Sequence, residues 1–225
     1  MKKNKLNIIS AIKKGWNMTI SKFWGYVFYS GVFILVGALA GEIPYVGLVI
    51  QYALILSSLV AIIRLNNGAD FNFNILKITW RQLFVFFITT LVIMSVFVPL
   101  VMLILVLNNV AADRSYLAVL QSNPYFALAI TLSFVFGAYM ATRLSYSPFA
   151  ILEMNHGPMK SIKHSWDITE GSSLKIFVLG LASVFMLSLG LIGFLIGVFV
   201  AYPIIYFAFV DSYKQLNNND QENIK

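Results

Sequence analysis

Residues 147–177 read SPFAILEMNHGPMKSIKHSWDITEGSSLKIF, and they contain both histidines of the chain between two long apolar runs. Pro158 suits the first turn of a helix and Gly171 suits its end. Between them, four residues fall at helical spacing: Met159, Ile162, Trp166 and Thr169. Charged and imidazole groups lie off this stripe: Lys160, Lys163, His164 and Asp167. The pattern predicts a short amphipathic helix on a membrane surface, followed by a helix that begins at Ser172 or Ser173 and enters the bilayer.

The composition indicates a membrane protein. Of the 225 residues, 59% are hydrophobic and 11% are charged, with a mean hydropathy of +0.80. Soluble domains carry about 45–50% apolar and about 25% charged residues. The apolar residues also occur in runs close to the 18 or so that mark a membrane-crossing helix. We therefore expect an all-α, polytopic membrane protein. The chain has no cysteine, which excludes disulfides and thiolate metal sites.

The apolar runs predict six transmembrane helices, paired into three hairpins. They are residues 23–40, 45–63, 83–107, 125–141, 174–190 and 192–210. Pro99 falls inside the third run and predicts a kink there. Fifteen of the sixteen Lys and Arg residues lie on one side of this arrangement, and Arg114 alone lies on the other. The positive-inside rule places the fifteen, and both termini, in the cytosol. The net charge of +7 follows from this asymmetry and gives no support to nucleic-acid binding.

The first 22 residues carry six lysines and no acidic residue. Isoleucine or tryptophan recurs in them every four residues: Ile8, Ile12, Trp16 and Ile20. One interpretation is a basic cytosolic leader. We prefer a second surface helix, because the segment repeats the pattern of residues 159–169.

A shift of 150 residues aligns the two ends of the chain without a gap. Lys13 and Trp16 then fall on Lys163 and Trp166, and Gly47 falls on Gly197. The alignment divides a single membrane domain, 1–225, into three parts: a first repeat unit (8–65), a central hairpin (75–143) and a second unit (158–215). Both units enter the membrane from the same side, so a pseudo-two-fold axis along the membrane normal would relate them. The central hairpin gives the Lys-x-x-Trp pattern a third time, as a further copy or by coincidence.

The repeated motif has a physical role at the membrane surface. Trp prefers the headgroup level, and Lys prefers the anionic cytosolic leaflet. We expect these residues to anchor the interface: Lys13, Trp16, Lys77, Trp80, Lys160, Lys163 and Trp166. Two glycine pairs at a spacing of four residues predict close helix packing: Gly37 with Gly41, and Gly193 with Gly197.

Several segments resemble one protein family. They are 146–153 (YSPFAILE), 161–171 (SIKHSWDITEG), Ile176-Phe177, 203–213 (PIIYFAFVDSY) and 12–16 (IKKGW). The combination resembles a group of uncharacterised bacterial membrane proteins, which includes the membrane domain attached to some glycerophosphodiester phosphodiesterases. The resemblance implies six helices in the bacterial inner membrane and supplies no catalytic residues. The phosphodiesterase domain, with its acidic metal site, is missing from this sequence.

One group of side chains has the composition of a metal or catalytic site: Glu153, His156, His164, Asp167 and Glu170. Glu153 with His156, and His164 with Asp167, have a spacing of three that is compatible with metal ligation. Gly157-Pro158 separates the two pairs, however, and nothing in the sequence brings them together. We prefer the interpretation of a hydrated helix surface, and we expect no catalysis, metal or cofactor.

The predicted spans contain no ionisable side chain in their interiors, which disfavours ion-coupled transport. We therefore expect a non-catalytic protein that binds membrane lipid, a membrane-protein partner or a second copy of itself through its cytosolic surface helices. The alternative is a permease, or an export or immunity component, for an amphipathic substrate. A continuous polar groove between the repeats would favour the permease. A bundle sealed by aromatic and glycine contacts would favour lipid binding.

Overall fold

The structure is a computed structural model that describes residues 6–43, 46–70, 76–110, 124–192 and 196–224. The described chain is all-α. Its helices are α1 (Ile8–Ser21), α2 (Phe23–Gly41), α3 (Val46–Asn66), α4 (Trp80–Val110), α6 (Pro124–Leu144), α7 (Ser147–Met154), α8 (Pro158–Ile168), α9 (Ser173–Ile192) and α10 (Ile196–Ile224).

Local signals set the bounds of the two amphipathic helices. Asn7 caps α1, since its Oδ1 accepts a hydrogen bond from the Ser10 amide at 3.0 Å. α8 begins at Pro158, and Gly171 follows its end with a φ of +72°, in the left-handed region that favours glycine. α9 then starts at Ser173. The prediction of a helix in both segments is confirmed.

Four stretches of the described chain are long and apolar enough to cross a membrane: Phe23–Gly41, Val49–Asn66, Ala127–Met154 and Ser173–Ile192. The third takes in both α6 and α7, which a turn at residues 145–146 separates. α6 alone has 21 residues, and about 20 suffice to cross a hydrocarbon core. These helices indicate a multi-pass membrane protein.

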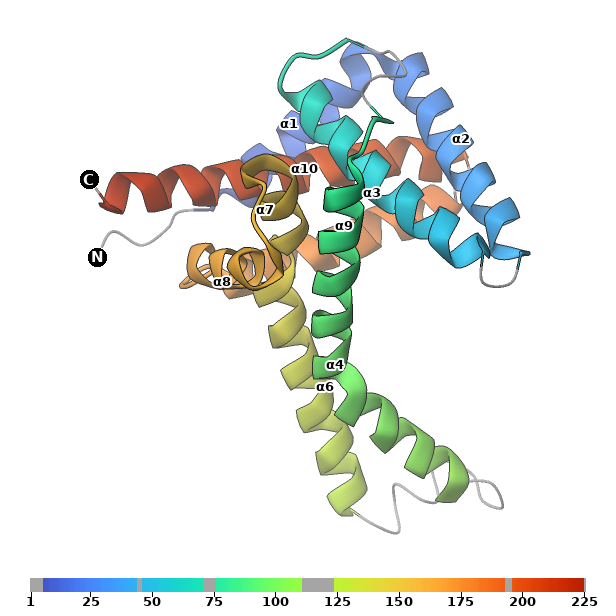
Figure 1. Cartoon of the computed structure of the whole chain (residues 1–225), viewed down its shortest axis with the longest axis vertical. Helices are drawn as coiled ribbons and strands as arrows, with labels where there is room; N and C mark the ends of the chain where they lie inside the picture. Colours follow the sequence, from blue (N-terminus) through green and yellow to red (C-terminus); the bar gives the residue numbers. More distant parts are fainter. Residues whose placement is uncertain (1–5, 44–45, 71–75, 111–123, 193–195, 225) are drawn as a thin grey trace.

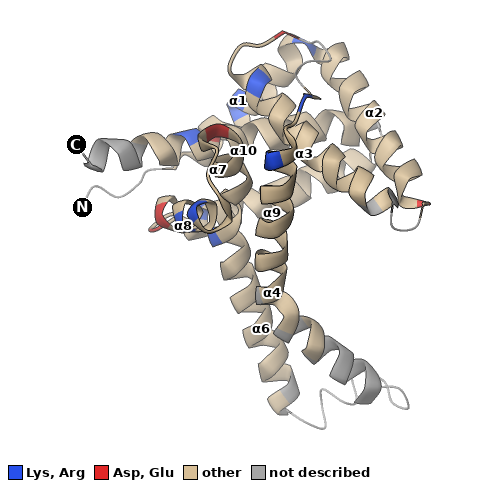
Figure 2. Ribbon diagram, viewed as in Figure 1, with Lys and Arg blue, Asp and Glu red and all other residues tan. Residues whose placement is uncertain are grey.

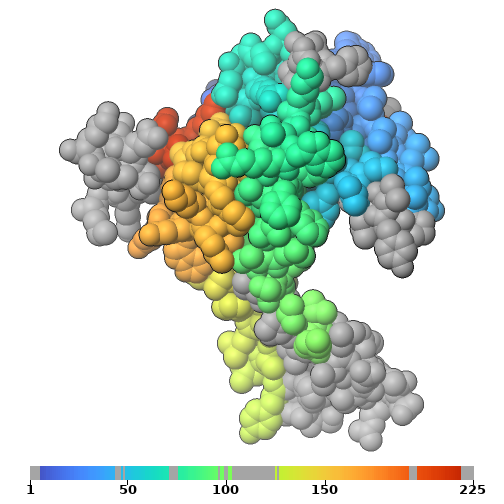
Figure 3. Space-filling model, viewed as in Figure 1, coloured from blue at the N-terminus to red at the C-terminus, as the bar shows by residue number. Residues whose placement is uncertain are grey.

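The long helices form three hairpins that diverge from one end of the molecule. The α2–α3 and α9–α10 hairpins point to the same side, whereas the α4–α6 hairpin runs in another direction (Figure 1). It projects from the rest of the molecule as a stalk (Figure 3). α4 bends in its second half (Figure 1). Pro99, where the sequence predicts a kink, belongs to the α4 residues whose side chains the structure does not describe.

The hairpins meet at the charged end, which we define as α1, α7, α8 and the second half of α10. Lys, Arg, Asp and Glu gather over these helices and the neighbouring helix ends, while the α6 shaft is uncharged (Figure 2). α10 is central here and contacts α1, α2, α3, α8 and α9. The buried aromatic core lies at this end and continues beside it: Phe149 stacks on Tyr213, with ring centroids 5.4 Å apart, and Tyr26 of α2 meets Phe207 edge-on at 5.2 Å.

Candidate functional site

At the charged end, α1 lies directly against α10. The buried face of α1 consists of Ala11, Gly15 and Thr19. A Cβ added at Gly15 would lie 2.4 Å from the carbonyl oxygen of Ile204, so this approach requires a glycine. Small side chains permit such close backbone contact between helices in membranes.

A polar network also joins α1 to α10. Lys14 Nζ lies 2.6 Å from Asp211 Oδ1, and the Asp211 residue is only 7% exposed. Gln215 donates from Nε2 to Asp211 Oδ2 at 2.7 Å and to Ser10 Oγ at 3.2 Å. Its Oε1 accepts from the Asn7 amide at 2.9 Å. The network satisfies the buried carboxylate and fixes the position of α1.

The opposite face of α1 is apolar and exposed. Ile9 is 80% exposed, and Trp16 and Ile20 are each 50% exposed. Lys13 is also exposed, beside this face. An apolar face flanked by lysines is the pattern of a helix that lies in a membrane interface. The predicted stripe is divided: Ile8 and Ile12 pack against the core, while Trp16 and Ile20, together with Ile9, face away from the protein.

The other predicted interface residues have different surroundings. Trp80, at the start of α4, is 83% exposed, and Lys77, Lys160 and Lys163 are exposed as well. Trp24 is 79% exposed in the first turn of α2, a position that the sequence analysis did not single out. Its signal was present, because the tryptophan stands at the start of an apolar run, two residues after Lys22.

Trp166 lies against protein. The Arg143 guanidinium lies over its ring, 4.3 Å from the centroid, and the Tyr139 ring meets it edge-on at 6.1 Å. Arg143 is itself only 5% exposed, so this cation–π contact is largely shielded from water. Of the predicted apolar stripe of α8, Met159 is exposed, while Trp166 is engaged with the end of α6.

α8 closes the end of α6 through its small polar face. Ser165 Oγ donates to the Arg143 carbonyl oxygen at 2.7 Å and accepts from the Tyr146 amide at 3.2 Å. The buried positions along this side of α8 and just beyond it are Ser161, Ser165 and Thr169. A shift of 150 residues places them on the buried face of α1, namely Ala11, Gly15 and Thr19. α1 and α8 therefore bury corresponding positions, although α1 packs against α10 and α8 packs against the end of α6.

The two histidines come together although Gly157-Pro158 separates them in sequence. Asn155, in the left-handed conformation (φ 55°), ends α7 and lets the chain turn. The His156 and His164 rings then lie 5.7 Å apart, nearly perpendicular, and Tyr213 lies 6.3 Å from His164. Asp167 and Glu170 are exposed on α8 and at its end. Within the described residues, no group of three or more His, Cys, Asp and Glu side chains is placed to hold a metal ion.

Glu153, on α7, lies near Tyr213 and Lys214. Partial burial raises the pKa of the Glu153 carboxyl, and the Lys214 charge offsets part of this rise. Burial, followed by the negative charge of Glu153, raises the pKa of the Tyr213 hydroxyl. Lys214 Nζ donates to Asn67 Oδ1, which links α10 to the end of α3.

Glu153 also lines a cavity of about 490 Å³ between the end of α3, the start of α4 and α7. Its polar lining residues are Arg64, Asn67, Gln82 and Glu153. Its apolar lining residues are Val60, Ile63 and Leu152. The cavity therefore combines a cation, an anion, two amides and an apolar wall.

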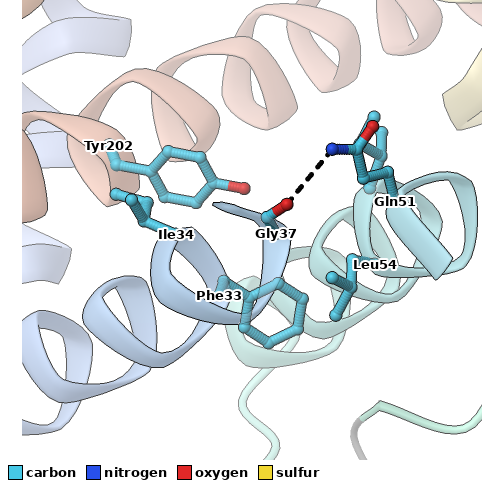
Figure 4. Close-up of a pocket in the computed structure, with 7 residues that line it drawn as sticks. Phe33, Ile34, Gly37, Gln51, Leu54 and Tyr202 are labelled. Atoms are coloured by element: carbon cyan, nitrogen blue, oxygen red, sulfur yellow. Dashed lines mark hydrogen bonds between the residues drawn. The ribbon is translucent and has the colours of Figure 1, made fainter. Parts of the chain in front are cut away.

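A second cavity, of about 220 Å³, lies between α2, α3 and α10 (Figure 4). Gln51 is the most polar side chain of the second predicted span, and its Nε2 donates to the Gly37 carbonyl oxygen at 3.1 Å. Phe33, Ile34 and Leu54 supply much of the remaining wall. The Gln51 amide thus already serves to join α2 to α3.

The glycines make close contacts at corresponding points of two hairpins. A Cβ at Gly47 would lie 1.8 Å from the Ala40 carbonyl oxygen, and a Cβ at Gly197 would lie 2.7 Å from the Gly190 Cα. The predicted packing glycines on α2 differ: a Cβ at Gly37 would meet nothing within 4 Å, and one at Gly41 would meet Gln51 Nε2 at 3.0 Å. Gly193 lies outside the described residues.

Comparison with known proteins supplies no identification. No protein-family model matches the chain, and no curated protein or solved structure matches it either.

Proposed function

We propose that this is a bacterial inner-membrane protein with six transmembrane helices and cytosolic termini, which binds membrane lipid through α1 and α8 without catalysing a reaction. One observation carries the proposal: α10 holds α1 so that Ile9, Trp16 and Ile20 are exposed beside Lys13. A helix fixed in this way inserts its apolar face at the headgroup boundary, and its lysine faces the anionic lipid.

Two observations support six spans and a parallel repeat. α4 and α10, with 31 and 29 residues, are long enough to cross a bilayer, as are the four helices already named. The close contacts Ala40–Gly47 and Gly190–Gly197 occupy positions related by the 150-residue shift, as do the buried faces of α1 and α8. These matching backbone contacts support the proposed repeat beyond the likeness of apolar segments.

The cavities beside the proposed spans favour lipid over a polar substrate. A groove of about 300 Å³ runs between α6 and α9, and its lining is mainly apolar: Ala138, Ala141, Ile176, Phe177, Leu181, Val184 and Phe209. Apolar grooves of this kind suit acyl chains, whereas a permease for a polar solute needs polar groups along its path. The Gln51 amide, bonded to Gly37, contributes to helix packing.

The proposed topology predicts opposite accessibility at two sites. Single cysteines can be placed at Asn109 and Asn155, because the chain contains no cysteine. In intact cells, an impermeant maleimide is expected to label the Asn109→Cys protein and leave the Asn155→Cys protein unlabelled until the cells are opened. Labelling of Asn155→Cys in intact cells would overturn the orientation.

The proposed lipid contact predicts different quenching of Trp16 and Trp166. Two variants each keep one of these tryptophans, with the other three replaced by Phe. In vesicles containing lipids brominated near the headgroup, Trp16 fluorescence is expected to be strongly quenched, because half of this residue is exposed. Trp166 is expected to be quenched much less, because it stacks on Arg143.

Equal, weak quenching of the two tryptophans would contradict lipid binding by α1. The protein-to-lipid ratio distinguishes lipid from a protein partner on this face. If the quenching of Trp16 disappears as this ratio rises, the exposed apolar face of α1 contacts a second copy of the chain.

A further inference from the structure

The 490 Å³ cavity lies where a lipid headgroup would reach it. It is formed by the end of α3 and the start of α4, which are the cytosolic ends of two proposed spans. Val60, Ile63 and Leu152 form its apolar wall, and the exposed Trp80 ring stands two residues before Gln82. Tryptophan marks the headgroup level of a bilayer. The polar lining is therefore at the depth of phosphate and amine groups.

The cavity presents donors for an anion on one side. Arg64 contributes a guanidinium, which suits a phosphate. Gln82 Oε1 accepts from the Thr79 amide at 3.1 Å, so this bond orients the side-chain amide and does not use its Nε2 donor. The Asn67 side chain is held in place by Lys214, which adds a second positive charge near the cavity.

Glu153 contributes an acceptor for a cation. Its carboxylate makes no hydrogen bond or salt bridge to the part of the chain that the structure describes. Lys214 acts on it through space, and Glu153 is exposed while lining the cavity, so its carboxylate is open to a ligand. A ligand ammonium group would form a charge-assisted hydrogen bond with this carboxylate. A ligand that met only the cationic side would leave this acceptor unused.

We propose that this cavity binds the headgroup of an aminophospholipid such as phosphatidylethanolamine, with its ammonium facing Glu153 and its phosphate facing Arg64 and Gln82. A zwitterion matches a site that holds both charge signs. A primary ammonium also donates hydrogen bonds to a carboxylate. A choline group cannot do so, because it has no N–H donor. The proposal rests on the membrane location proposed above but not on the contact of α1 with lipid.

The test measures binding of dihexanoyl phosphatidylethanolamine, phosphatidylcholine and phosphatidylglycerol to the purified full-length protein in detergent, by titration and native mass spectrometry. The ethanolamine lipid is expected to bind most tightly. Glu153→Gln is expected to weaken its binding about 10-fold, equivalent to about 1.4 kcal/mol, and to leave phosphatidylglycerol binding unchanged or stronger. Arg64→Gln and Gln82→Leu are expected to weaken binding of all three lipids.

Glu170→Gln is the matched control, because Glu170 is an exposed acid beyond the end of α8 and does not line the cavity. It is expected to change none of the affinities. Equal affinity for the three lipids, or an ethanolamine preference that survives Glu153→Gln, would overturn the proposal. Free phosphoethanolamine tests the source of the headgroup: binding as tight as that of the lipid would assign the cavity to a soluble ligand and also overturn it. Loss of Trp16 quenching with an intact ethanolamine preference would refute only the role of α1.

Discussion

Gly47→Ala is expected to destabilise the protein by about 1–3 kcal/mol, the usual cost of overpacking. The new Cβ would lie 1.8 Å from the Ala40 carbonyl oxygen, a backbone atom that moves only if the α2–α3 hairpin opens. Gly190→Ala is expected to cost a similar amount, since its Cβ would lie 2.8 Å from the Gly197 carbonyl carbon. Thermal unfolding in detergent, followed by circular dichroism, measures both losses.

Gly37→Ala is the control on the same hairpin, because its Cβ would meet nothing within 4 Å. Alanine is a better helix former than glycine by up to about 1 kcal/mol, so this variant is expected to be as stable as the natural chain or more so. If the Gly47→Ala protein were as stable as the Gly37→Ala protein, this result would contradict the close contact between Gly47 and Ala40. A loss confined to one of the two hairpins would argue against their equivalence.

Lys14→Met is expected to release α1 from α10. It leaves Asp211 as a buried carboxylate without its cation, and breaking a buried ion pair costs about 3–5 kcal/mol. About half of the Lys14 side chain is exposed, so solvent screening reduces the expected cost to about 1–3 kcal/mol. The α1 amides are expected to exchange hydrogen faster by the factor that corresponds to this loss, because their exchange rate reports the free energy of local opening.

Lys13→Met is the control for this variant. Lys13 is the neighbouring residue and is exposed, and the structure gives it no ion pair with the described residues. It is expected to leave α1 protected. Adding Asp211→Asn to Lys14→Met removes the uncompensated charge and is expected to recover part of the loss. Equal protection of α1 in the Lys13 and Lys14 variants would show that the ion pair does not hold this helix.

The sequence was sufficient to predict the helices, because hydropathy and end signals are local. Pro158 and Gly171 bracket α8 as expected, and the long apolar runs coincide with long helices. Trp16 is half exposed, and its position at the membrane interface stays a prediction. Each of these inferences depends on residues close together in the chain.

Hydropathy could not predict which segments these helices pack against. Gly15 and Ser165 carry no apolar signal, yet Gly15 allows the close approach of α1 to α10, and Ser165 bonds α8 to the end of α6. The sequence around Trp166 is that of an interface anchor and does not show its contact with Arg143, because Arg143 is on a different helix. The two histidines looked separate because the left-handed turn at Asn155 was not recognised. Contacts between distant segments carry no signal in a local pattern.

The attachment of α1 to α10 has a consequence for biosynthesis. Lys14 and Asp211 are 197 residues apart, so at about 5–20 residues per second the ribosome needs about 10–40 s to produce the second partner after the first. During that interval the small face of α1 has no protein to cover it. The bilayer surface can hold its other face from the outset. In the nascent chain, α1 would therefore stay on the membrane surface without its partner. Its contact with α10 would form last and complete the assembly of the protein.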